Sequence, residues 1–143
     1  MKIVDRINQT NRLSADHAKL ILRLAIGFLI LLHGIYKLQN PAAMDFVGGA
    51  FASMGLPAAL AYLIYIGEII APIMLIVGYQ TRVASLLVAI TIFVAIVLVH
   101  LPQLFTLSEM GGGYALELQV MYLAGALAIF GLGAGKYTLT KQG

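Results

Sequence analysis

The sequence predicts an all-α integral membrane protein: a bundle of four membrane-spanning helices, with both termini in the cytoplasm and a short surface helix in the first outer loop. Apolar residues make up 61% of the 143 residues and charged residues only 10%, whereas soluble domains have about 45–50% and about 25%. Four apolar stretches each approach the roughly 20 residues that cross a hydrocarbon core of about 30 Å. The cations, in addition, gather at one end of these stretches.

Short connections join the predicted spans, so neighbouring helices should run antiparallel. The longest connection, residues 39–57, contains apolar residues at helical spacing, which predicts a short helix on the membrane surface. A lid over a ligand site is the alternative interpretation of this helix. Its apolar residues are Met44, Val47, Phe51 and Met54. The predicted spans are residues 20–38, 58–78, 81–101 and 114–131.

The distribution of lysine and arginine predicts the orientation, because these residues are enriched in cytoplasmic segments. All nine of them except Lys37 lie before or at the start of the first span, beside the turn at residues 78–82, or after the fourth span. A basic edge of this kind attracts anionic lipid headgroups, so the net charge of +3 requires no nucleic-acid partner. Arg23 and Arg82, at the cytoplasmic ends of spans, are predicted to contact lipid phosphates.

Three segments divide the chain. Residues 1–19 are predicted to form an amphipathic cytoplasmic segment, residues 20–139 the membrane domain and residues 140–143 a short cytoplasmic tail. We expect the first span to be retained rather than cleaved as a signal peptide, because it contains three basic residues and follows a long polar segment.

Cysteine is absent from the sequence, which excludes a thiol–disulfide enzyme and metal or iron–sulfur sites with cysteine ligands. No phosphate-binding or dinucleotide-binding glycine motif is present either, because the glycines at 111–113 precede an apolar span and lack the accompanying lysine. No metal site is predicted. A redox role would therefore need a bound cofactor, a lipid-soluble carrier or a partner subunit.

Five ionisable residues fall in the outer half of the predicted bundle. A charge at the membrane centre costs about 2.5–3.5 kcal/mol on insertion scales, so such residues usually face the protein interior and find partners. One interpretation is a paired network that fixes the order of the helices. The other is a polar pocket that binds a headgroup or passes protons, since histidine titrates near neutral pH. The five are His33, Lys37, Glu68, His100 and Glu117.

Several motifs, in this order and spacing, resemble the DoxX family of small bacterial membrane proteins. The resemblance covers residues 20–139, although the usual glycine–proline–glycine near the end reads Gly133-Ala134-Gly135 here. It implies a multi-pass protein of the bacterial inner membrane, and some relatives are subunits of quinone-linked oxidoreductases. The motifs are residues 23–27 (RLAIG), 33–37 (HGIYK), 54–57 (MGLP), Glu68, 78–82 (GYQTR), His100, 112–114 (GGY) and 133–137 (GAGKY).

Three functions stay open at this level. In the first, the polar pocket binds quinone, and a partner redox subunit supplies the electrons. In the second, the chain is a non-catalytic scaffold or assembly factor of the membrane. In the third, it transports protons or a small solute, which would require a homo-oligomer because four helices enclose little space. No catalytic residue is assigned, and whether the chain is an enzyme stays open.

Overall fold

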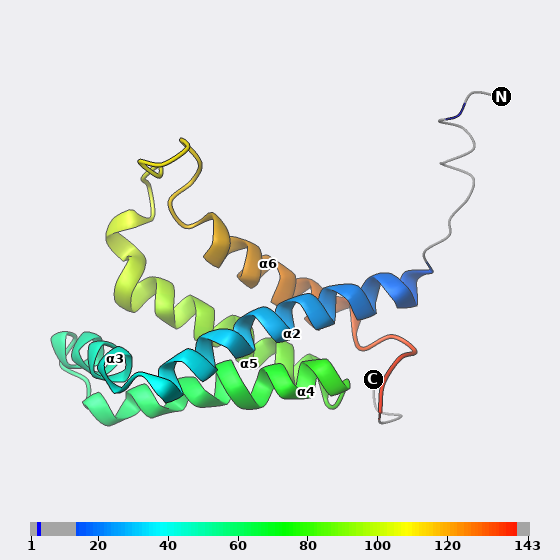
Figure 1. Cartoon of the computed structure of the whole chain (residues 1–143), viewed down its shortest axis with the longest axis horizontal. Helices are drawn as coiled ribbons and strands as arrows, with labels where there is room; N and C mark the ends of the chain where they lie inside the picture. The colour runs from blue at the N-terminus through cyan, green and yellow to red at the C-terminus, as the bar shows by residue number, and fades with distance from the viewer. Residues whose placement is uncertain (1–2, 4–13, 140–143) are drawn as a thin grey trace.

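The computed structural model describes Ile3 and residues 14–139 (Figure 1). Within this part of the chain the regular structure is helical, and the only strand-like feature is an isolated antiparallel bridge between Leu107 and Tyr114. Most of the predicted N-terminal segment, residues 1–19, and the predicted tail, residues 140–143, lie outside the described residues.

The first long helix is α2, Ala15–Gln39. It begins five residues before the predicted start, because the side chain of Ser14 accepts a hydrogen bond from the backbone N–H of His17 and caps the helix there. The predicted surface helix is α3, Pro41–Ser53. Its first residue is a proline, which suits the first turn of a helix because that N–H has no helical partner.

The second long helical stretch combines three kinds of turn. It consists of the 3₁₀-helix η1, Ala58–Leu63, the π-helix η2, Ile66–Ile70, and the α-helix α4, Ala71–Val77. A glycine in the left-handed conformation, Gly78 with φ of 76°, ends it. The prediction of one continuous apolar span over this region is therefore correct in extent, but its helical geometry changes twice.

The third stretch consists of α5, Thr81–Ala95, the π-helix η3, Ile96–His100, and the 3₁₀-helix η4, Leu101–Gln103. The fourth helix is α6, Glu117–Leu132. It begins three residues later than predicted, because the preceding loop forms backbone hydrogen bonds from Ser108 N to Gly113 O and from Ala115 N to Thr106 O. Among the described helices, three are long and apolar enough to cross a membrane and α6 is a shorter apolar helix. The molecule is therefore a helical membrane protein.

Both ends of the described chain lie at the same end of the bundle (Figure 1). The backbone N–H of Lys136 donates to Asp16 Oδ1 at 3.1 Å, and the backbone N–H of Leu139 donates to Val77 O at 3.0 Å. The turn after α4 lies at this end too, whereas α3 and the loop before α6 lie at the opposite end. The assignment of the first end to the cytoplasm stays a prediction.

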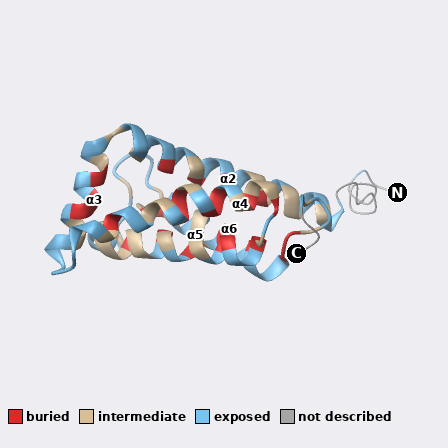
Figure 2. Ribbon diagram, turned by 90° about the horizontal axis from the view of Figure 1, so that it is seen from below, coloured by how far each residue is buried: buried red, intermediate tan, exposed pale blue. Residues whose placement is uncertain are grey.

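The main core lies where α2, α4, α5 and α6 face one another (Figure 2). A second, smaller cluster joins α3 to η1 and consists of Met44, Val47 and Ala61, with three partly buried neighbours. The outer faces carry large apolar side chains that are exposed, such as Phe28, Leu32 and Phe93. An apolar exterior is what a bilayer requires, since lipid tails cannot solvate polar groups.

Two glycines allow the second helical stretch to pack closely between α2 and α5. A Cβ at Gly34 would collide with the carbonyl oxygen of Glu68, and a Cβ at Gly67 would overlap the side chain of Thr91. Small residues at helix crossings are common in membrane proteins because they let two backbones approach. These contacts bring the ionisable residues of α2 and η2 close together.

Candidate functional site

A cavity of about 620 Å³ lies between α2, α3, η1, η2, α5 and η3. Its wall is mainly aliphatic and aromatic, and a small number of polar side chains interrupt it. Four of the five residues predicted to form a polar pocket line this cavity, together with Tyr36 and Thr91. The four are His33, Lys37, Glu68 and His100.

Lys37 and Glu68 form an ion pair in the cavity wall. The Nζ atom of Lys37 donates to Glu68 Oε1 at 2.8 Å and to Oε2 at 2.6 Å. The side chains of Lys37 and Glu68 are 17% and 11% exposed, so most of the surface of both side chains is buried within the protein. Lys37 and Glu68 belong to the five ionisable residues that the sequence grouped together, and here they pair directly.

The position of Glu68 depends on a π-helical turn. Pro72 lacks the N–H that would bond to the Glu68 carbonyl, and its ring would clash with that oxygen in a regular α-helix. The helix widens instead, and the backbone N–H of Ala71 donates to Ile66 O, five residues earlier. The Glu68 carbonyl lies against Gly34, where no side chain blocks it.

His100 also lies in a π-helical turn, in the next span. It is the last residue of the π-helix η3, and Pro102 follows two residues later, as Pro72 follows η2. Its Nδ1 atom lies 3.2 Å from Gln103 Oε1, which accepts a hydrogen bond when Nδ1 carries the proton. π-Helical turns are rare and occur often at functional sites. Two of them therefore carry ionisable residues of one cavity.

His33 lies one turn before Lys37 on α2 and contacts α6. Its ring meets Tyr122 edge to face, with centroids 6.0 Å apart and an interplanar angle of 81°. This geometry is favourable for two aromatic rings. His33 is exposed on its other side, so it lies at the rim of the cavity rather than at its centre.

Glu117 does not line the cavity, in contrast to the prediction. Because α6 begins at this residue, its carboxylate lies in the first helical turn, where the helix dipole favours a negative charge. The side chain is exposed and extends over Gly113 in the preceding loop. The late start of α6 is the reason that depth counting along the sequence placed it wrongly.

Arg23 has a different environment from the predicted lipid contact. Its side chain is 2% exposed, and its guanidinium donates to Ala134 O at 2.6 Å and to Tyr137 O at 2.5 Å. It therefore ties the segment after α6 to α2. Arg82 is exposed, and its guanidinium lies beside Gly133. A lipid-phosphate contact of Arg82 stays a prediction.

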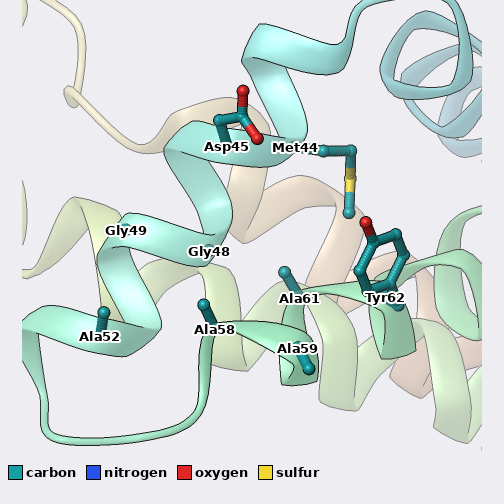
Figure 3. Close-up of a pocket in the computed structure, with 9 residues that line it drawn as sticks. All are labelled: Met44, Asp45, Gly48, Gly49, Ala52, Ala58, Ala59, Ala61 and Tyr62. Carbon is teal, nitrogen blue, oxygen red and sulfur yellow. The ribbon is translucent and has the colours of Figure 1, made fainter.

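A second cavity of about 370 Å³ lies between α3 and η1 (Figure 3). Glycine and alanine form most of its wall, including Gly48, Ala52 and Ala58, and the polar members are Asp45 and Tyr62. The apolar pattern of residues 44–54 predicted α3 but not this space, because a void depends on how two short helices meet. Among the described residues no group of three or more metal-ligating side chains is present.

Comparisons with known proteins agree with this architecture. The DoxX family model matches residues 18–101, more than half of the chain. A protein of Bacillus subtilis (strain 168) named "Putative oxidoreductase CatD" is 34% identical over 92 residues, which are 64% of this chain and 66% of that protein, just under two thirds of its length. No solved structure matches the chain. The family match includes the helices that carry His33, Lys37, Glu68 and His100 but ends before α6. This chain belongs to the DoxX family.

Proposed function

We propose that this protein is a subunit of an oxidoreductase system in the bacterial inner membrane and that its 620 Å³ cavity binds a quinone. One observation supports the proposal most directly. A charged pair, Lys37 and Glu68, lies in the wall of a mainly apolar cavity within membrane-spanning helices. The oxidoreductase part is consistent with the name of the Bacillus subtilis relative.

The size and lining of the cavity suit a quinone headgroup. Small-molecule sites usually have volumes of about 300–1,000 Å³ and are mostly apolar with a few convergent polar groups. A quinone is a flat apolar ring with two carbonyl acceptors. The ammonium of Lys37 has three N–H donors, and two of them form hydrogen bonds to Glu68. The third can donate to a ligand carbonyl.

The histidines have the chemistry that proton exchange requires. Reduction of a quinone to a quinol takes up two electrons and two protons, and an imidazole ring can both donate and accept a proton. His33 and His100 lie in the wall of the same cavity as the ion pair. In this scheme Lys37 binds the carbonyl, the histidines exchange protons and a partner subunit supplies the electrons. The chain itself has no cysteine for a thiol or iron–sulfur redox centre.

The direct test is extraction of lipids from the protein purified in mild detergent, followed by mass spectrometry for quinones. The parent should retain quinone at close to stoichiometric amounts, and Glu68→Gln should retain much less, because an unpaired ammonium reorganises the site. Glu109→Gln is the matched control, since it makes the same chemical change in an exposed loop away from the cavity. Absence of quinone from both the parent and the control would refute the proposal.

The scaffold interpretation predicts a different result in the same experiment. Glu68→Gln would then lower the melting temperature while no preparation, including the parent, contained quinone. The transport interpretation predicts flux of protons or solute in liposomes that contain the purified protein. These outcomes separate the three functions that the sequence left open.

A further inference from the structure

The charged pair of the 620 Å³ cavity lies in a buried part of its wall, whereas most of the exposed residues of that wall are apolar. Lys37 and Glu68 are 17% and 11% exposed. Several apolar residues of the same wall are far more exposed: Leu63 at 57%, Ile90 at 51% and Ile66 at 39%. The charged residues of the cavity wall are therefore buried, whereas these apolar residues of the same wall are exposed at the protein surface.

These exposed wall residues belong to the helices that are long and apolar enough to cross a membrane. Leu63 and Ile66 lie in the stretch Ala58–Val77, and Ile90 lies in the stretch Thr81–Gln103. A side chain that is exposed on the outside of such a helix faces lipid rather than water. The two stretches contact each other at Gly67 and Thr91, which also line the cavity.

The aromatic side chains at the rim are consistent with this view. Tyr36 and Phe46, from α2 and α3, also belong to the cavity wall and are 60% and 63% exposed. Tyrosine is enriched where a membrane meets water, because its ring is apolar and its hydroxyl is polar. The cavity thus has its charged pair inside and a mainly apolar and aromatic margin outside, in which His33 is the ionisable member.

We infer that the ligand of this cavity is a membrane-dissolved amphiphile that enters sideways from the bilayer, with its polar head at Lys37 and Glu68 and its apolar tail leaving between η1–η2 and α5. The inference rests on the proposed function only for the identity of the head as a quinone. It adds a requirement that the head alone does not impose, namely a hydrocarbon or isoprenoid tail. A tail that remains in contact with lipid keeps its apolar surface out of water.

The absence of cysteine from the sequence provides a clean test. A single thiol is introduced by Ala95→Cys in the cavity wall, by Ala124→Cys on the exposed face of α6, or by Glu109→Cys in the exposed loop. Each variant is placed in lipid nanodiscs. Each is then treated with an apolar reagent, benzyl methanethiosulfonate, or with a charged quaternary-ammonium methanethiosulfonate that does not enter hydrocarbon.

The ratio of the apolar to the charged labelling rate reports which medium reaches the thiol. We expect this ratio at position 95 to resemble that at position 124 and to exceed that at position 109 by about tenfold or more, because a fixed charge is excluded from hydrocarbon. Rapid labelling of position 95 by the charged reagent would overturn the inference, since the cavity would then open to water. The inference would also be overturned if the apolar reagent labelled position 124 but not position 95.

A second measurement separates this inference from the proposed function. A naphthoquinone with an isoprenoid tail should slow labelling of Ala95→Cys by the apolar reagent, whereas menadione, which has the same ring without the tail, should slow it much less. Equal protection by both compounds would overturn the requirement for a tail. Lipid-side labelling with no protection by either quinone would support access from the bilayer and refute quinone as the head.

Discussion

The ammonium of Lys37, in the last turn of α2, contacts both carboxylate oxygens of Glu68, in the π-helical turn η2, at 2.8 and 2.6 Å. The pair joins two helices, and its two residues are 31 positions apart in the sequence. Removal of one member of a buried pair leaves an uncompensated charge, whereas removal of both does not. This difference gives the first prediction.

Lys37→Met and Glu68→Gln should each lower the free energy of unfolding by about 3 kcal/mol. The double variant should lose clearly less stability than the two single losses added together. A double-mutant cycle measured by thermal unfolding in detergent checks this. Additive losses would contradict it, since they would mean that the two groups stabilise the bundle independently.

Close packing at Gly34 gives the second prediction. Gly34→Ala should destabilise the protein by about 1–3 kcal/mol, because the added methyl group must displace the backbone of η2 at Glu68. Gly131→Ala is the matched control: it makes the same change in α6 at a position where a Cβ has no neighbour within 4 Å. We expect the control to have an unchanged or slightly raised Tm, because alanine favours a helix more than glycine does. Equal losses in both variants would argue against the α2–η2 contact.

Arg23 gives the third prediction. Arg23→Gln should increase hydrogen exchange in residues 133–139, because the carbonyls of Ala134 and Tyr137 lose a charged donor. The loss of stability should be about 1–3 kcal/mol. Glu109→Gln serves as the control, since it removes a charge from an exposed loop at the opposite end of the bundle. Unchanged exchange in Arg23→Gln would show that the segment is held by its other contacts, such as that of Tyr137 with His17.

Glu117 gives the fourth prediction. Glu117→Gln should leave quinone retention unchanged, because its carboxylate is exposed at the start of α6 and does not line the cavity. Its effect on stability should be within about 1 kcal/mol, the usual size of a helix-dipole interaction. The measurement is the same lipid extraction that tests Glu68→Gln. A loss of quinone in Glu117→Gln would favour the five-residue pocket predicted from the sequence.

Much of the fold could be predicted because membrane crossing imposes strong rules on length and polarity. The approximate extents of the spans and the short helix α3 follow from hydropathy and spacing. The sequence grouped Lys37 and Glu68 with three other ionisable residues but did not single out their pairing. The two π-helical turns were not predicted, although Pro72 and Pro102 are their sequence signal. A proline shows that a helix must adjust, but the choice between a kink, a break and a wider turn depends on the neighbouring helices.

The environments of Arg23 and Glu117 were predicted less well, for a physical reason. A count of residues along a span gives the depth of a side chain but not its direction or the exact start of the helix. Arg23 meets carbonyls that lie 111 and 114 residues later in the chain, and no local pattern encodes that contact. Glu117 is displaced because backbone hydrogen bonds of residues 106–115 delay the start of α6.

The paired π-helical turns have a consequence for how insertions and deletions would act on this cavity. A π-helical turn holds one residue more than the α-helical turn it replaces, and each residue of a helix rotates the chain by about 100°. Deletion of one residue from Ile66–Ile70 or from Ile96–His100 would leave the length of the span nearly unchanged but would turn Glu68 or His100 relative to the rest of its helix. One extra residue in each span is therefore enough to change the direction of Glu68 or His100, while the helix beyond the turn keeps its lipid-facing surface.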